Sequence, residues 1–150
     1  MKAILLATAA GLCWGVGELF TKSVLHTHKV GPLTAIAVRS TVALPVLWIA
    51  YYIAVHVTRA EPADWRTAAG TPTLLKLVLG SGLIAGAAAM ICFYAALNVG
   101  EISRVKPIAF ALAPAVASLL AFVVLHEPLT ARKALGITAI LLGVFLLTGK

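Results

Sequence analysis

Residues 77–99 read LVLGSGLIAGAAAMICFYAALNV, and no charged side chain interrupts this stretch. A helix needs about 20 mainly apolar residues to cross the hydrocarbon core of a bilayer, so the stretch is long enough. Backbone groups in lipid must be satisfied within their own segment, which favours a helix, and the run is too long for a barrel strand. The stretch therefore predicts a membrane-spanning helix, and it identifies the bilayer as the solvent of this chain.

The composition of the whole chain agrees with a membrane protein. Of its 150 residues, 61% are hydrophobic and 11% are charged, and the mean hydropathy is +1.03. A soluble domain has roughly 45–50% apolar and about 25% charged residues, and its core could not cover this much apolar surface. These values argue against a soluble enzyme, a nucleic-acid-binding protein and a disordered chain. The net charge of +7 lies at the ends of apolar runs, where it can face anionic lipid headgroups.

The sequence lacks the motifs of metal and cofactor chemistry. His26 and His28 form an isolated H-x-H pair, while Cys13 and Cys92 lie inside apolar runs without metal-ligand or disulfide spacing. A Walker loop, an HExxH motif and a CxxC motif are all missing from the sequence. We therefore expect no metal, no cofactor and no enzymatic activity.

Apolar runs of sufficient length occur five times, which predicts an all-α integral membrane protein with one transmembrane domain over residues 1–150. The first run is interpreted as a retained helix and not as a signal peptide, because the remainder is not a soluble protein. A short interfacial helix is expected around Trp65 in the one long connection, and Thr130 is the expected N-cap of the last and shortest span. The five spans cover about residues 3–25, 32–57, 74–99, 103–125 and 131–147.

Positive charges are divided almost evenly between the two sides of the membrane. An odd number of spans places the termini on opposite sides, so six positive side chains lie on the N-terminal side and five, including Lys150, on the other. A positive-inside bias is normally larger than this. Two interpretations stay open. In the first, the chain inserts in both orientations. In the second, the three positive charges around the long loop hold the N-terminus inside the cell.

Two charged residues lie well inside predicted spans at a matching depth. Glu18 precedes the end of the first span by about seven residues, and Arg39 follows Pro32 by seven, which places both roughly 10 Å below the membrane surface. Charged residues at such a depth usually face the interior of the bundle or a water-filled cavity. We predict an ion pair between Glu18 and Arg39, with Lys22 as an alternative partner one turn further along the first helix.

Glu18 shares one face of the first helix with residues that suit a substrate or proton site. Gly11, Trp14, Gly15 and Lys22 lie on this face by their three- and four-residue spacing. The glycines allow a close approach of the backbone, Trp14 offers a flat apolar wall, and Glu18 offers a titratable carboxylate. The alternative interpretation is a buried ion pair that only fixes how the helices pack.

Further candidates for solute binding lie on the third and fourth spans. Tyr94 and Asn98 are four residues apart and share a face of the third span, so they either line a cavity or bond across helices. Lys106 comes one turn inside the fourth span. Its ammonium group either attracts an anionic substrate or reaches outward to the lipid headgroups.

The fourth span and the turn after it contain a candidate hinge and a single carboxylate. Pro114 interrupts the middle of the span and frees a backbone carbonyl, which predicts a kink or hinge. Glu127 lies in the turn between the last two spans. We expect it to cap the following helix or to pair with Arg132 or Lys133, and not to take part in chemistry.

The order of several short motifs resembles the EamA-type proteins of the drug/metabolite transporter superfamily. No single motif is unique, but their order is fairly specific and covers essentially the whole chain. The motifs are Gly-Leu-Cys-Trp-Gly at residues 11–15 with Lys22, then Pro32 with Arg39, then SRVKPIAFALAP at residues 103–114, then HEPLT at residues 126–130, and finally Gly136 and Gly143.

The resemblance implies a transporter of small organic solutes built from five-helix units. Relatives with two such units in inverted orientation form a ten-helix bundle, so this chain corresponds to one half of an inverted-repeat bundle. If it is complete, the expected working form is an antiparallel homodimer in the bacterial or archaeal inner membrane. The family arrangement places Trp14, Glu18, Arg39 and Tyr94 near the central cavity. The expected partners are a small-molecule substrate and membrane lipids, and not nucleic acid.

Three positions depart from the family pattern. Trp14 stands where the related small multidrug resistance proteins have their essential glutamate, and Glu18 occupies a place that is more often apolar or small. Lys106 stands where an apolar residue is usual, which implies a preference for anionic solutes. We expect alternating-access transport of small metabolites or drugs. The alternatives are a lipid-linked sugar flippase and a non-transporting subunit that needs a partner chain.

Overall fold

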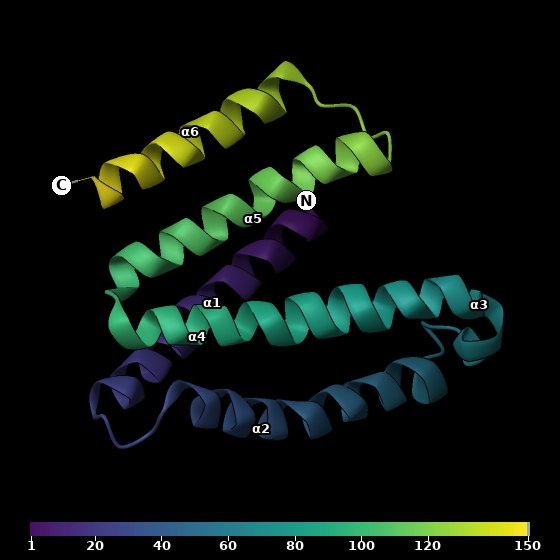
Figure 1. Ribbon diagram of the computed structural model, residues 1–150. Helices are drawn as coiled ribbons and strands as arrows, with labels where there is room; N and C mark the ends of the chain where they lie inside the picture. The colour runs from purple at the N-terminus through teal and green to yellow at the C-terminus, as the bar shows by residue number, and fades with distance from the viewer. Residues whose placement is uncertain (150) are drawn as a thin grey trace. The chain divides into compact units, whose positions relative to one another are not determined.

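The computed structural model describes residues 1–149, which form helices and their connections without any strand (Figure 1). Lys150, which belongs to the charge distribution above, lies outside the described residues. The predicted all-α membrane architecture with five spans is confirmed. Five helices are long and apolar enough to cross a bilayer, namely Lys2–His26, Pro32–Val57, Trp65–Val99, Ile102–Val124 and Ala131–Thr148.

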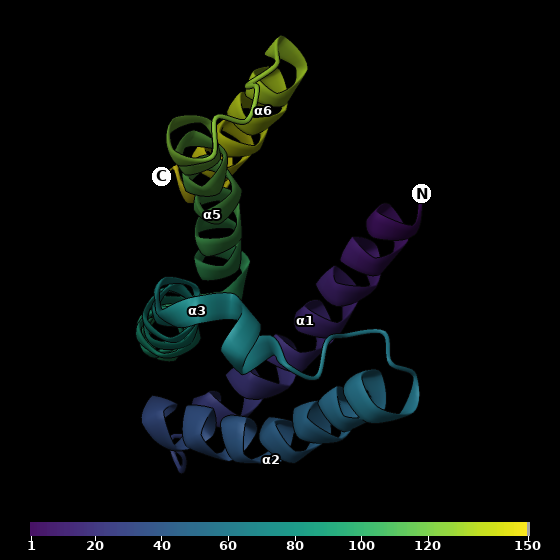
Figure 2. The same ribbon diagram turned by 90° about the vertical axis from the view of Figure 1, so that its right-hand side faces the viewer.

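The helices form two compact units, Met1–Asn98 and the chain from Val99 onward. The second unit is a hairpin of α5 (Ile102–Val124) and α6 (Ala131–Thr148), which lie side by side and antiparallel in Figure 1 and overlap in Figure 2. The first unit contains the remaining elements in chain order: α1 (Lys2–His26), α2 (Pro32–Tyr52), η1 (Ile53–Val57), α3 (Trp65–Leu75), η2 (Lys76–Ala88) and α4 (Ala89–Val99).

The helical segment that contains the third span runs from Trp65 to Val99, with a break at Gly70. Gly70 has φ 67° and ψ 162°, so two helices meet end to end at this residue. Glycine adopts this left-handed φ without the steric cost of a Cβ, and Pro72 suits the first turn of the helix that follows. The short helix expected around Trp65 is present, and it is joined directly to the long span.

The middle of the third span is a wide π-helix. At its end the amide of Ala89 donates to the carbonyl of Ile84, five residues back, whereas an α-helix bonds four residues back. A Cβ built on Gly86 would lie 3.2 Å from the carbonyl oxygen of Ser81, which is also five residues back. Glycine therefore suits a position where the wide turn brings a carbonyl close to the place of a side chain.

Caps and prolines shape the second unit. The hydroxyl of Thr130 accepts a hydrogen bond from the backbone N–H of Lys133 at 3.3 Å, which confirms the predicted N-cap of α6. Pro107 and Pro114 both lie inside α5, and the helix continues through them to Val124. α6 has 18 residues and is the shortest of the five spans.

Candidate functional site

The first unit contains a partly open cavity of about 200 Å³ between α1 and α2. α1 contributes five of the lining residues from one helix face, and α2 contributes the sixth. The lining of this cavity brings together three of the predicted site residues, Trp14, Glu18 and Arg39. The complete lining is Cys13, Trp14, Gly17, Glu18, Thr21 and Arg39.

Glu18 is the least exposed charged residue in residues 1–149, with 3% of its surface accessible. A carboxylate is costly to bury in an apolar environment unless polar groups or water accompany it. Glu18 meets this condition because it lines a cavity that also contains the guanidinium-bearing Arg39 and the hydroxyl-bearing Thr21. The matched depth of Glu18 and Arg39 therefore places both in one polar site.

Arg39 binds a tyrosine of another helix. Its Nη1 donates a hydrogen bond to the Tyr94 hydroxyl at 2.8 Å, and its guanidinium carbon lies 5.8 Å from the Tyr94 ring centroid. Tyr94 is completely buried, and a cation near an aromatic face is stabilised by the ring quadrupole. Tyr94 therefore holds the guanidinium of Arg39 from the third span. The two charged residues meet as walls of the same cavity.

The Tyr94 hydroxyl also connects the site to α1. It lies 3.5 Å from the Thr21 hydroxyl, and Thr21 in turn donates to the Gly17 carbonyl at 3.2 Å. Because the Tyr94 oxygen accepts from Arg39, its own proton is available to Thr21. The hydrogen bonds thus run in one direction from α2 through α4 to α1. Thr21 was not among the predicted site residues, although its position three residues after Glu18 places it on the same helix face.

Lys22 fixes α1 to α4 at a second point. Its Nζ donates to the carbonyl oxygen of Leu97 at 2.7 Å. Leu97 lies in the last turn of α4, where carbonyl groups lack partners within the helix, and a cation is favourable near this end of the helix dipole. Lys22 therefore helps to hold the first and third spans together beside the cavity.

The remaining candidates do not line this cavity. Asn98 is exposed at the end of α4. Lys106 belongs to α5 in the second unit, where its Nζ lies 5.2 Å from the ring centroid of Phe110, one helix turn further along. Pro114 lies in the middle of α5.

Five helices long and apolar enough to cross a membrane, two of which share a pocket lined by charged residues, define a class of protein, the multi-pass helical membrane proteins. Residues 1–149 match the family model of the EamA-like transporter family, and the chain belongs to this family. The resemblance seen in the motif order is thereby confirmed, and the chain is a membrane protein of the drug/metabolite transporter type. Comparisons with curated proteins and with solved structures give no match.

Proposed function

We propose that the chain is a secondary transporter that moves small organic metabolites or drugs across the inner membrane by alternating access. Membership of the EamA-like transporter family supports this proposal. The observation that carries the proposed site is the cavity in which α1 and α2 place Glu18 and Arg39 together, within two spans. Charged residues inside a membrane usually mark a substrate or ion pathway.

Each proposed site residue has a role that follows from its chemistry. Arg39 binds an anionic group of the solute, and Tyr94 positions the guanidinium for this task. Trp14 provides an apolar wall, while Glu18 binds a cationic group or carries protons. Asn98 and Lys106 are proposed as further solute contacts, with Lys106 favouring anionic solutes.

The direct test of transport uses the purified chain alone in liposomes. A panel of metabolites and drugs is first screened for thermal stabilisation, because a ligand at 100 times its Kd stabilises the native state by about 2.7 kcal/mol. Exchange of a stabilising solute without a second polypeptide is the expected result. Exchange that requires a partner chain would identify a subunit, and movement of lipid-linked sugars in place of soluble compounds would identify a flippase.

The proposed working form is an antiparallel homodimer. The nearly even distribution of positive charge supports insertion in both orientations, and inverted pairs provide a route to alternating access. A reporter fused to the C-terminus should therefore give signal on both sides of the membrane. A single orientation, together with crosslinks that form only between parallel copies, would contradict the dimer.

Pro114 is proposed as a hinge of α5. Proline cannot donate to the carbonyl of Phe110, so the helix is easier to bend at this point. Pro114→Ala should leave membrane insertion and thermal stability intact and should slow solute exchange. Pro45→Ala, which changes a proline inside α2, is the matched control. An unchanged exchange rate in Pro114→Ala would show that bending at this residue does not limit transport.

A further inference from the structure

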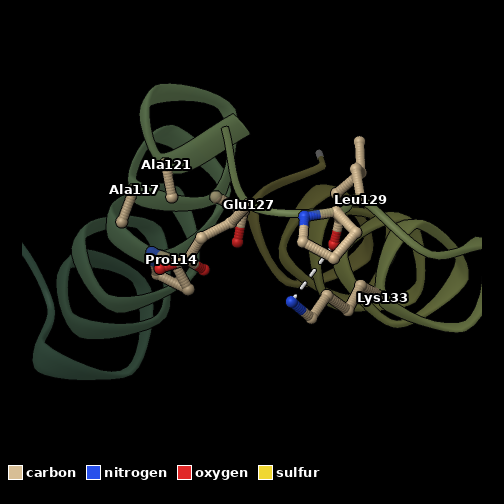
Figure 3. Close-up of a pocket in the computed structure, with 8 residues that line it drawn as sticks. Pro114, Ala117, Ala121, Glu127, Leu129 and Lys133 are labelled. Carbon is tan, nitrogen blue, oxygen red and sulfur yellow. Dashed lines mark hydrogen bonds between the residues drawn. The ribbon is translucent and has the colours of Figure 1, made fainter. Parts of the chain in front are cut away.

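The second unit contains its own cavity, of about 300 Å³, at the corner where α5 turns into α6 (Figure 3). One side of this cavity, which we call the floor, is lined by small side chains from α5, namely Pro114, Ala117, Ser118 and Ala121. The helix rises by about 10 Å between Pro114 and Ala121. These small side chains therefore form a largely apolar floor that leads from the corner into the span.

The backbone of Glu127 is fixed at the outer end of this floor. His126 has a left-handed backbone with φ 54°, which reverses the chain after α5, and the amide of Glu127 donates to the Ala121 carbonyl at 3.1 Å. The backbone that carries Glu127 is thus tied to the last turn of α5. Glu127 lines the cavity, and Figure 3 shows its side chain directed toward the α5 residues.

A lysine lies across the cavity from this carboxylate. Among residues 1–149 the expected ion pair of Glu127 with Arg132 or Lys133 is not formed. Lys133 Nζ donates to the carbonyl oxygen of Pro128 at 3.3 Å (Figure 3). An ammonium group has three N–H donors, so two remain for a ligand. The cavity therefore offers an acceptor carboxylate and a donor cation that are not neutralised by each other.

We infer that this cavity binds a phospholipid whose headgroup carries a primary ammonium, of the ethanolamine type. The headgroup ammonium donates to the Glu127 carboxylate, the phosphate accepts from Lys133, and an acyl chain lies on the small-residue floor of α5. The polar end lies between the end of α5 at Val124 and the start of α6 at Ala131, which is the headgroup level of the membrane. The inference does not depend on the proposed transport function.

Charge and shape together select this lipid over others. A choline headgroup has no N–H to donate to Glu127, and a glycerol headgroup leaves the lipid anionic and opposite a carboxylate. A soluble zwitterion would satisfy both charges but would leave the apolar floor uncovered. A lipid with a primary ammonium satisfies the charges and covers the floor.

Native mass spectrometry of the delipidated full chain tests this site. The protein is mixed with equal amounts of phosphatidylethanolamine, phosphatidylcholine and phosphatidylglycerol, and the bound lipids are counted. Hydrogen bonds to charged groups are among the stronger ones, so we expect about tenfold more phosphatidylethanolamine than either competitor. Equal binding of the three lipids, a preference for phosphatidylglycerol, or no retained lipid would each overturn the inference. Soluble phosphoethanolamine that displaces the lipid at equal concentration would also overturn it.

Matched variants locate the site. Glu127→Gln should abolish the preference for phosphatidylethanolamine, whereas Glu101→Gln, at the other end of α5, should keep it. Ala121→Leu fills the floor and should reduce total lipid binding, whereas Ala113→Leu on the same helix should not. Because Glu127→Gln removes a charge from an exposed turn, it is expected to fold even if Ala121→Leu does not. A preference that survives in folded Glu127→Gln would assign the lipid to another surface.

Discussion

Arg39→Gln is expected to lower the rate of solute exchange by about tenfold or more. The substitution removes the cation that lines the cavity of the first unit and the donor that binds the Tyr94 hydroxyl. Exchange in liposomes, normalised to the amount of inserted protein, measures the effect. Lys29→Gln is the matched control, because it removes a positive charge from an exposed residue of the same unit.

Tyr94→Phe separates solute binding from helix packing. It keeps the buried ring and removes only the hydroxyl that joins Arg39 to Thr21. Interhelical hydrogen bonds in membranes contribute about 0.6 kcal/mol on average and up to about 1.7 kcal/mol, so stability should fall within this range. If Arg39 acts only in packing, Arg39→Gln and Tyr94→Phe should lose equal stability and equal transport, and the double variant should lose no more. Normal exchange by Arg39→Gln would remove Arg39 from the proposed site.

Glu18→Gln is expected to remain folded, to bind the solute and to lose the pH dependence of uptake. Glutamine keeps the shape of the side chain but cannot exchange a proton, so uptake driven by a pH gradient should fall to the level of empty liposomes if Glu18 carries the coupling proton. Uptake measured over a range of pH, with and without a gradient, checks this. Glu61→Gln in the exposed connection after η1 is the control.

A structural role for Glu18 would give a different result. In that case Glu18→Gln and Arg39→Gln should each lose the proposed folded dimer, because one charge would then lie unpaired in a low-dielectric environment. The combined variant should recover the dimer. Folded Glu18→Gln with unchanged, pH-dependent uptake would contradict both interpretations.

The depth of a residue could be predicted from the sequence, but its partner could not. Counting residues from the span ends at 1.5 Å each was sufficient to place Glu18 and Arg39 at one level, and both line one cavity. The choice of Tyr94 as the partner of Arg39 depends on how α4 is rotated about its axis. The π-helical turns of η2 change this rotation, because they advance the chain by more residues per turn than the 3.6 on which helix-face analysis rests.

Local rules explain which boundaries were predicted correctly. Thr130 was recognised because an N-cap depends on a side chain and an amide only three residues away. The short helix around Trp65 and the long span after it were both predicted, but their direct junction at Gly70 was not, because it depends on the left-handed φ of this glycine. Thr21 was detectable from its face of α1, but a hydroxyl in a membrane helix often bonds only to its own backbone, as Thr8 does with Ile4.

The unequal lengths of the spans have a consequence for the surrounding membrane. α6 has 18 residues, which extend over about 27 Å, slightly less than the roughly 30 Å of a typical hydrocarbon core. The third span is longer, and its break at Gly70 separates the short helix that begins at Trp65 from the long helix that follows. Hydrophobic mismatch costs fractions of a kcal/mol per Å and sorts proteins among membranes. The bilayer should therefore thin beside α6, and membranes of short-chain lipids should accommodate this protein better than thick, ordered ones.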